Sequence, residues 1–424
     1  MDNVGKNTKK VWNEFFWVIG GGLLQLPLIS EVKKLGYKVI VSDRDSSCVC
    51  AKDADIFLEI DIFDVQKHLE EAFHLKCSGI KISGVLAAGI DATVTMAVLG
   101  RSLGLPGVDP IIAYITNNKD IFRETLKKMG YSVPKFKVIS MKNFDDIEST
   151  VKEIGYPLIV KNTDSSGSRG TKIFYEENLE GIKEAIKSAI SVSRSGRALI
   201  EELWVGEEQT VETIFDINGN FHPCFITDRI FDKSNSYAIE IGLRHPTSLP
   251  SQKQKELYSL VEKVARDLGI HIGAAKADMM LTDKGPRIIE MTVRLSGGFD
   301  CQYLLPAATG KNVMRAAILT ALGKPFPRGL LEDKKNRIGL TASIWPEPGK
   351  IVAIEGIEEA KKIPGFEKLF FRYNVGDIVE PYIDCTKRVC FIIVTGKDEI
   401  SAKNTLQKVL NTIKIKTKKE YEDD

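Results

Sequence analysis

The sequence predicts a mixed α/β protein: an open parallel α/β sheet comes first, an α+β region follows, and the C-terminal part is rich in strands. The length of 424 residues accommodates about two or three domains of roughly 100–200 residues each. An apolar run, a turn and an amphipathic helix alternate through the first 115 or so residues. From about Pro325 onwards the pattern becomes strand-rich, with one late helix.

The N-terminal pattern begins with a short apolar run at residues 15–19, which predicts a buried strand. Three glycines follow, and then four apolar residues at spacings of 4, 4 and 3 mark one face of a helix: Leu24, Leu28, Val32 and Leu35. Residues 38–42 supply the next strand, and residues 54–60 and 85–88 continue the pattern. Alternating strands and helices favour a parallel sheet.

The glycine cluster raises the question of a dinucleotide site, because such a site needs G-x-G-x-x-G and an acidic residue about 20 positions later. Gly20, Gly22 and Asp43 comply, but Gln25 stands where the third glycine belongs. We therefore favour a plain β–α–β turn in a nucleotide-free domain. An NAD-dependent dehydrogenase is the alternative, and it depends on these residues alone.

The middle and end of the chain alternate further helices and strands. A helix with an asparagine cap is expected over residues 117–130, and a hairpin is expected from KADMML and PRIIEM across the turn at 282–285. The remaining expectations are strands at 133–139, 158–160, 172–175, 198–201 and 209–215, helices at 179–186, 257–268 and 402–413, and a frayed charged tail from Lys414.

The bulk composition excludes several functions. With 59 basic and 57 acidic side chains, no overall field attracts nucleic acid or anionic lipid. Seven scattered cysteines predict reduced thiols and a cytoplasmic protein. Lys6, Lys9 and Lys10 precede the apolar stretch 15–29 in the manner of a secretory signal, but Glu14 and the glycines oppose this, so we expect no targeting segment and no membrane span.

The strongest chemical signal is IIEMTVRLSGG, residues 288–298, together with Asp278 on the preceding strand. Asp278 and Glu290 on neighbouring strands would lie about 5 Å apart and repel unless a cation joins them. Carboxylate oxygens select Mg²⁺, and Arg294 would add a positive charge suited to phosphoryl transfer. An ordinary acidic hairpin with a surface arginine remains open at this point.

Two further segments carry weaker signals. Lys161 ends an apolar strand and precedes a loop of small residues, NTDSSGSRGT, whose N–H groups could wrap phosphates, although loops of this kind are usually mere turns. Glu201 and Glu202 close a strand, and Glu208 follows the turn at Gly206. That segment could offer groups to adenine and ribose, or it could be an acidic surface hairpin.

The order and spacing of these segments resemble the ATP-grasp superfamily, in its biotin carboxylase-like branch, and especially the L-amino acid ligases and related carboxylate–amine ligases. The resemblance covers essentially the whole chain. It implies an ATP-grasp fold with a Rossmann-like pre-ATP-grasp domain (1–116), a clamp-like ATP-grasp domain (117–324, small lobe about 132–205) and a β-rich C-terminal domain (325–424). The first domain of such proteins holds no dinucleotide, so the glycines form a turn beside the active site.

The resemblance also implies roles for single residues. Lys119 and Lys161 contact the ATP phosphates, and Arg294 steadies the phosphorylated intermediate as the catalytic arginine. The remaining implied residues are Ser165, Ser166, Gly167, Gly170 and Thr171 in a lid over the phosphates, Glu201, Glu202 and Leu203 beside adenine, Glu208 beside ribose, Asp278, Glu290 and Thr292 on Mg²⁺ (or Mn²⁺), and Glu240 and Gly297 on the substrate side.

One departure concerns the second metal site. The family has asparagine in E-x-N-x-R, whereas this chain has Thr292. The hydroxyl of threonine is a shorter and poorer ligand than an amide carbonyl, so a weaker second Mg²⁺ site or a shifted ligand follows as a hypothesis.

The implied reaction phosphorylates a small carboxylic or amino acid at the expense of ATP, and an amine then attacks the acyl phosphate and expels phosphate. Alternatives are a carboxylase or formate-using enzyme of the same superfamily, and a nucleotide-binding protein without turnover. The partners are small-molecule acids and amines, not nucleic acid or membrane, and a homodimer is compatible with the family. Specificity is expected from loops around 228–246 and 294–305, where Arg244 and His245 either hold a substrate carboxylate or are solvated.

Overall fold

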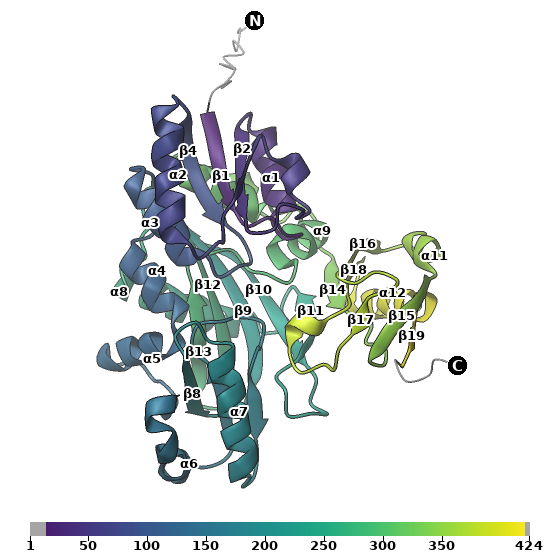
Figure 1. Ribbon diagram of the computed structural model, residues 1–424. Coiled ribbons are helices and arrows are strands. Elements are labelled where there is room, and N and C mark those ends of the chain that lie inside the picture. The colour runs from purple at the N-terminus through teal and green to yellow at the C-terminus, as the bar shows by residue number, and fades with distance from the viewer. Residues whose placement is uncertain (1–13, 420–424) are drawn as a thin grey trace, which may run out of the picture.

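The computed structural model describes residues 14–419, which form four β-sheets with helices packed against them (Figure 1). The first sheet lies at the top of this view, a small sheet lies at the bottom, and the C-terminal part projects to the right. Lys6, Lys9 and Lys10 lie outside the described residues, and so does the start of the expected first domain. Within residues 14–419, no helix combines the length and apolar character needed to cross a bilayer.

The first sheet is entirely parallel, in the order β3-β2-β1-β4, which confirms the predicted N-terminal pattern. Its elements are β1 (Glu14–Ile19), α1 (Leu26–Lys34), β2 (Lys38–Asp43), η1 (Ala51–Asp53), β3 (Ile56–Glu59), α2 (Val65–Cys77), β4 (Lys81–Ala87) and α3 (Thr93–Ser102). Phe16, Trp17, Val18 and Ile19 of the central strand β1 are completely buried, because helices cover both faces of a parallel sheet.

The glycine turn after β1 is used for structure rather than for a dinucleotide. Gly21 N donates to Asp43 Oδ2 at 2.7 Å, so the acidic residue that would hold a ribose caps the turn instead. Gln25 is 1% exposed; its Oε1 accepts from Gly22 N at 2.9 Å and its Nε2 donates to Ala88 O. The residue that replaces the third glycine therefore ties the turn to β4.

The helix expected over 117–130 is split in two. α4 (Pro110–Asn117) ends before Asn118, whose extended backbone (φ −121°, ψ 106°) separates it from α5 (Lys119–Lys128). The expected asparagine cap is wrong in detail, because Asn118 Nδ2 donates backwards to Tyr114 O at 2.8 Å and caps nothing in α5. Lys119 N donates instead to Thr163 O at 2.7 Å, which joins the start of α5 to the loop after β6.

The small sheet has the order β5-β8-β6-β7 and occupies residues 136–202, within the expected small lobe. Its elements are β5 (Phe136–Ser140), η2 (Met141–Asp146), α6 (Ile147–Ile154), β6 (Leu158–Asn162), β7 (Lys172–Phe174), α7 (Leu179–Ser191) and β8 (Arg197–Glu202). α6 and α7 bury their apolar faces against the sheet and form a separate hydrophobic core with it.

The largest sheet has eight strands in the order β13-β12-β9-β10-β11-β14-β18-β16. It consists of β9 (Glu207–Phe215), β10 (Phe221–Phe231), β11 (Glu240–His245), β12 (Gly273–Thr282), β13 (Gly285–Thr292), β14 (Ile338–Ala342), β16 (Phe366–Phe371) and β18 (Cys390–Gly396). The sheet continues across the expected boundary near residue 325, because β14, β16 and β18 join strands of the preceding region.

The hairpin of β12 and β13 is confirmed, with Asp278 directly opposite Glu290. α8 (Ser251–Asp267) packs its buried residues into the core behind these strands. The expectation that residues 228–246 form loops is wrong in part: about half of this segment belongs to β10 and β11, which pair antiparallel. These strands lack the alternation of a one-sided sheet, because side chains on both faces are partly or fully buried.

The C-terminal part adds a three-stranded sheet in the order β17-β15-β19. Its elements and the connecting helices are η3 (Asp300–Leu304), α9 (Leu305–Thr309), α10 (Val313–Ala321), η4 (Arg328–Leu330), β15 (Gly349–Glu355), α11 (Ile357–Lys361), β17 (Ile378–Val379), η5 (Cys385–Lys387), α12 (Glu399–Thr412) and β19 (Lys414–Lys418). The frayed tail expected from Lys414 is wrong. The basic run forms β19, which pairs antiparallel with β15.

Phe299 anchors the C-terminal part to the turn after β13. Its ring is 2% exposed, stacks on Phe370 of β16 at 4.3 Å between centroids, and meets the edge of Phe391 of β18 at 4.9 Å. The residue has φ +62°, a conformation that costs energy outside glycine and persists only when packing holds it. This aromatic contact therefore determines how β16 and β18 sit beside the rest of the sheet.

We expect Phe299→Ala to lower the free energy of unfolding by about 3–5 kcal/mol, because it removes a buried ring and leaves a cavity. Urea denaturation followed by tryptophan fluorescence measures the change. Phe73→Ala, at a ring that is 65% exposed, should stay within about 0.5 kcal/mol of wild type. Equal stability of the two variants would contradict the role of Phe299 as the anchor of the C-terminal part.

Candidate functional site

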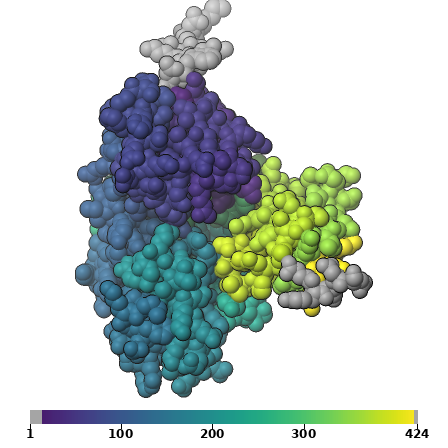
Figure 2. Space-filling model, in the orientation of Figure 1, coloured from purple at the N-terminus to yellow at the C-terminus, as the bar shows by residue number. Residues whose placement is uncertain are grey.

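A cavity of about 350 Å³ lies where the first sheet, the small lobe, the large sheet and the C-terminal part meet. Figure 2 shows the same regions meeting on one face: purple residues above, teal residues below and yellow-green residues at the right. Most of the predicted site residues line this cavity. They are Lys119, Lys161, Ser165, Ser166, Gly167, Thr171, Glu208, Glu240, Asp278, Glu290, Arg294 and Gly297.

The other predicted residues lie close by but outside the cavity wall: Gly170, Glu201, Glu202, Leu203 and Thr292. Glu201, Glu202 and Leu203 close β8 and enter the hinge to β9, and Leu203 N donates to Pro157 O at 3.0 Å. Gly170 belongs to the turn of the lid, with φ +61° and no room for a Cβ beside Ala189.

Asp278 is a buried, ionised carboxylate surrounded by donors. Its Oδ1 accepts from Thr210 at 2.8 Å, and its Oδ2 lies 2.5 Å from Lys276 Nζ and 3.2 Å from Arg229 Nη1. Burial by itself would raise the pKa of Asp278, but the charges of Arg229 and Lys276 outweigh it and hold the pKa well below its usual range. The charges of Arg229 and Lys276 therefore favour the ionised form of Asp278.

Arg229 of β10 joins carboxylates from three neighbouring strands. Its guanidinium lies 3.1 Å from Glu208 on β9, 2.8 Å from Glu240 on β11 and 3.2 Å from Asp278 on β12. The sequence analysis missed this residue because it placed residues 228–246 in loops. If β10 had been recognised as a strand, Arg229 would have stood out as a basic residue between two strands that carry acidic residues.

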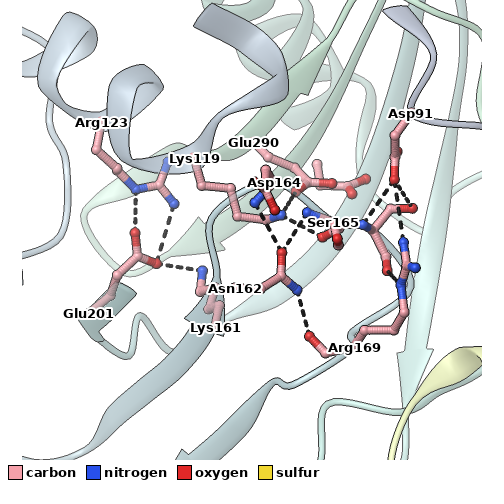
Figure 3. Close-up of polar contacts among 12 residues, drawn as sticks. Asp91, Lys119, Arg123, Lys161, Asn162, Asp164, Ser165, Arg169, Glu201 and Glu290 are labelled. Atoms are coloured by element: carbon pink, nitrogen blue, oxygen red, sulfur yellow. Dashed lines mark hydrogen bonds and ion pairs between the residues drawn. The ribbon is translucent and has the colours of Figure 1, made fainter. Parts of the chain in front are cut away.

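Lys119 reaches the cavity from the first turn of α5. Its Nζ donates to Ser165 O at 2.8 Å and lies 4.0 Å from Glu290 Oε2 (Figure 3). Desolvation lowers the pKa of Lys119, although the nearby carboxylates of Glu290 and Asp91 oppose the shift. The side chain thus forms a bridge between the glycine-rich loop and the second hairpin carboxylate.

Lys161 is held by a buried ion-pair chain. Glu201 Oε2 lies 2.5 Å from Lys161 Nζ, and Glu201 Oε1 accepts from Arg123 Nε at 2.7 Å (Figure 3). Burial opposes ionisation of Glu201, yet Arg123 and Lys161 lower its pKa to about 2. Glu201 consequently orients the ammonium group of Lys161, and its carboxylate does not line the cavity. Arg123, inside the apolar face of α5, was not singled out from the sequence.

The loop 165–171 is closed and held by side chains at both ends. Asn162 Oδ1 accepts from Asp164 N at 3.1 Å and from Ser165 N at 2.5 Å, and its Nδ2 donates to Arg169 O at 2.6 Å (Figure 3). Gly167 and Ser168 have positive φ angles of 75° and 58°, which suits glycine and strains serine. The small residues of this loop are therefore required by its turns.

Asp91, just after β4 in the first region, ties this loop to the catalytic candidate Arg294. Its Oδ2 accepts from Ser166 N at 3.1 Å and Ser166 Oγ at 2.8 Å and lies 3.6 Å from Arg169, while its Oδ1 lies 3.5 Å from Arg294 Nη2 (Figure 3). Burial opposes ionisation of Asp91, but the charge of Arg294 helps to lower its pKa. The sequence contained a signal for Asp91 that was not used: the residue follows a parallel strand, and ligands bind beyond the carboxyl ends of such strands.

The environment of Thr292 differs from that of Glu290. Thr292 pairs across the hairpin with Lys276, so an ammonium group stands on the side where the family has an amide ligand. Within residues 14–419, no group of three or more His, Cys, Asp or Glu side chains forms a ready-made metal site. Asp278 and Glu290 on one face still fit a divalent ion whose other ligands are phosphate oxygens and water.

Arg244 and His245 are neither solvated nor part of the cavity. His245 is 3% exposed, its Nδ1 lies 3.2 Å from Ile226 O, and burial lowers its pKa to about 4. Arg244 pairs with Glu399 at 3.0 Å and Asp228 at 3.5 Å. Both alternatives considered for these residues are therefore wrong, because the chain around them is packed strand β11.

Glu212 of β9 lies completely buried beneath the site. Its Oε2 accepts from Ser296 N at 2.8 Å, and its Oε1 has no hydrogen-bond partner within residues 14–419. Burial raises the pKa of Glu212 to about 7, despite the donor from Ser296 and the charges of Lys276 and Arg294. Burial thus favours the protonated form of Glu212 well above the pH at which an exposed glutamate titrates.

Comparison with known protein families finds an ATP-grasp domain over residues 154–302 and an L-amino acid ligase C-terminal domain 2 over residues 343–418. The ATP-grasp match contains the lid, the β8–β9 hinge and the carboxylate hairpin. The chain therefore contains an ATP-grasp domain and an L-amino acid ligase C-terminal domain 2, as the resemblance implied. Proteins with this domain use ATP together with Mg²⁺ or Mn²⁺.

Solved structures confirm the ATP-grasp fold. L-amino acid ligase from Bacillus licheniformis matches with a TM-score of 0.80 at 20% identity, over 96% of this chain and 99% of that one. N5-carboxyaminoimidazole ribonucleotide synthetase from Thermotoga maritima matches with a TM-score of 0.69 at 21% identity, over 95% and 99%.

Two sequence relatives are much longer proteins. Carnosine synthase 1 from Homo sapiens is 21% identical over 329 residues, which cover 72% of this chain and 39% of that protein. The carbamoyl phosphate synthase large chain from Campylobacter jejuni is 26% identical over 288 residues, which cover 67% and 25%. This chain thus spans well under half the length of either. The relatives are ATP-dependent ligases that act on small molecules.

We expect Asp91→Asn to loosen the loop 165–171, because it removes the charge that Ser166 and Arg169 share with Arg294. Hydrogen exchange of the loop amides, measured without nucleotide, should become about tenfold faster, the equivalent of one charge-assisted hydrogen bond. Asp145→Asn, at an exposed position in η2, is the matched control and should leave exchange unchanged. Equal protection in Asp91→Asn and wild type would contradict the proposed tie.

We expect Glu212→Gln to remove a pH-dependent loss of stability. The folded-state pKa of about 7 lies above the ordinary glutamate value of 4.5. The neutral carboxyl therefore costs nothing at low pH, and stability falls as the pH rises from about 4.5 to 7. At pH 8 the variant should unfold with up to about 3 kcal/mol more free energy than wild type, and at pH 5 with a much smaller difference. Urea denaturation at both pH values measures this. The exposed Glu207→Gln is the control, and a difference that does not vary with pH would refute the assignment.

Proposed function

We propose that this protein is an ADP-forming carboxylate–amine ligase. It activates a small carboxylic or amino acid as an acyl phosphate and then joins it to an amine, with release of ADP and phosphate. The observation that carries the proposal is one cavity in which two lysines, a closed glycine-rich loop, a carboxylate hairpin and a buried arginine converge. The matches to an ATP-grasp domain and an L-amino acid ligase domain support it.

The nucleotide would lie between the small lobe and the large sheet. Lys119 and Lys161 would bind phosphate oxygens, and the loop containing Ser165, Ser166, Gly167, Gly170 and Thr171 would cover them. Glu201, Glu202 and Leu203 at the hinge would flank adenine, and Glu208 would accept from the ribose. Because Glu201 already balances Lys161 and Arg123, the hinge backbone rather than this carboxylate would meet the adenine edge.

Asp278 and Glu290 would hold Mg²⁺ or Mn²⁺. When bound, the ion would neutralise charge on the phosphates and thus favour phosphoryl transfer. Glu290 is the more open ligand, since its ion pair with Lys119 is 4.0 Å long, whereas Asp278 is already engaged by Lys276 and Arg229. Thr292 remains a candidate ligand, but Lys276 beside it supplies a fixed positive charge that reduces the need for a second ion.

Arg294 would act on the substrate that receives the phosphoryl group. Its buried guanidinium leaves Nε without a partner within residues 14–419 and so retains a free donor for the carboxylate oxygen or acyl phosphate. Transfer of the γ-phosphoryl group replaces a poor leaving group by phosphate. The amine then attacks the carbonyl carbon, the C–N bond forms, and phosphate departs. Glu240 and Gly297 would line the substrate side.

Closure of the loop 165–171 would exclude water, which hydrolyses acyl phosphates. Asp91, Asn162 and the backbone contact from Cys385 N to Gly167 O at 3.0 Å hold the loop in place over the cavity. The acid, the amine, a homodimeric state and a cytoplasmic location remain predictions.

An ADP-release assay tests the proposal. The full chain is incubated with MgATP, an acid and an amine, each alone and in pairs, and the ligation product is identified by mass spectrometry. ADP that appears only with both substrates, together with an amide product, is the expected result. Dependence on bicarbonate or formate would instead support the carboxylase or formate-using alternative, and tight ATP binding without ADP would support a non-catalytic protein.

We expect Glu290→Gln to lower the rate of ADP release at least about 100-fold while preserving the fold, because it removes one of the two carboxylates that hold the metal. Glu153→Gln, at an exposed position in α6, is the matched control and should keep the wild-type rate. A Glu290→Gln protein with full activity would overturn the metal assignment.

A further inference from the structure

One end of the cavity is built by the C-terminal part. Arg372 after β16 and Arg388 after η5 line the same cavity as the ATP-grasp residues, together with Cys385, Thr386 and Phe391. This end is not required to bind a nucleotide. It therefore has a role that the ATP-binding residues do not explain.

Arg388 is a buried cation with unused hydrogen-bonding capacity. The residue is 6% exposed, and its guanidinium lies 4.5 Å from the centroid of the Phe391 ring. Its Nη2 donates to Glu240 O and lies 3.7 Å from Glu240 Oε1, but its Nε has no partner within residues 14–419. A buried donor without a partner is costly, and Arg388 also lines the cavity, so the arrangement indicates an anionic ligand.

Arg372 adds a second positive charge at the same end. Within the part of the chain that the structure describes, its side chain forms no hydrogen bond or ion pair. Desolvation and the charge of Arg388 both lower the pKa of Arg372. Of the carboxylates near the pair, Glu240 is already held by Arg229 at 2.8 Å, and Asp384 acts on Arg372 through its charge. The two arginines are therefore under-compensated.

Lys119 and Arg388 stand at opposite ends of a row of five strands. Glu290, Asp278, Glu208, Arg229 and Glu240 stand on the successive strands β13, β12, β9, β10 and β11. Lys119 pairs with the first of these residues and Arg388 with the last. Four steps of about 4.8 Å separate the two ends by on the order of 19 Å. The Lys119 end and the Arg388 end are thus distinct, although the lid residue Gly167 reaches the Arg388 end, where its O accepts from Cys385 N at 3.0 Å.

We propose that Arg388 and Arg372 bind a second carboxylate of a substrate, one that is not phosphorylated in the reaction. Given the proposed ligase function, this carboxylate belongs either to a dicarboxylic acid or to an amine that also carries a carboxylate. The planar guanidinium of Arg388 suits bidentate recognition of such a group, and Arg372 adds charge at the rim. The C-terminal part would thus select substrates by charge.

Matched probes that differ by one carboxylate test this proposal in the ADP-release assay. Succinate is compared with succinamate as the acid, and glycine is compared with glycinamide as the amine. In one of the two comparisons, the probe with the extra carboxylate should have a KM at least about tenfold lower, as one charge-assisted contact provides. The comparison that shows the preference identifies which substrate carries the group.

Variants connect the preference to the two arginines. Arg388→Gln and Arg372→Gln should raise the KM of the carboxylate probe at least about tenfold and change that of its amide less than about twofold. Arg388→Lys should retain part of the preference, because it keeps the charge and loses the fork. Arg337→Gln, at a half-exposed arginine beside Glu367, is the matched control. An equal rise for both probes would indicate a merely structural role and overturn the proposal, as would a wild type without any preference.

Direct binding separates failure of the proposal from failure of the ligase function. If no substrate pair releases ADP, calorimetry with succinate or glycine and the full chain, in the presence of MgADP, still measures the site. Binding that Arg388→Gln weakens at least about tenfold supports the carboxylate site even when the ligase assignment fails. No binding to wild type, or equal binding to the variant, overturns it.

Discussion

The site depends on the position of Arg229 between three carboxylates. Glu208, Glu240 and Asp278 come from three neighbouring strands, and like charges at such distances would raise one another's pKa or separate the strands. The guanidinium contacts all three within 2.8–3.2 Å. It thereby offsets the repulsion among three carboxylates that line one wall of the cavity.

Charge compensation also organises the other side of the cavity. Glu201 forms an ion pair with Lys161. Asp91, from the first region, contacts both the lid and Arg294. Neighbouring carboxylates thus fix the cations that phosphate would meet. Buried ion pairs of this kind are costly to desolvate and are weak sources of stability. Their role here is positional: Glu201 fixes the ammonium group of Lys161, and Asp91 fixes the guanidinium of Arg294.

The three parts of the chain meet at the site through a few specific contacts. Asp91 reaches it from β4, the small lobe contributes the lid, and the aromatic stack of Phe299 on Phe370 brings the C-terminal strands alongside. Cys385 and Arg388 follow from that docking, because both lie between β17 and β18. In a site assembled in this way, the residues that the C-terminal part contributes can vary while the residues of the ATP-grasp region stay the same.

Much of the fold and half of the site could be predicted from the sequence. The glycine turn, the parallel sheet and the β12–β13 hairpin follow from local periodicity, and Asp278 opposite Glu290 follows from that hairpin because its two strands are adjacent in the chain. The loop at 165–171 and Lys161 follow from a strand that ends in small residues. The sequence alone therefore determined the elements whose partners lie nearby along the chain.

Only the tertiary structure decided the rest. Strands β10 and β11 read as loops because burial on both faces removes the alternating pattern, and β19 read as a frayed tail because its pairing with β15 lies more than 50 residues away. Asp91, Arg229, Lys276 and Arg388 acquire their roles from neighbours distant in sequence, at positions where no local pattern marks a charged residue as buried. Ion pairs depend on distance in space, and chain topology sets that distance.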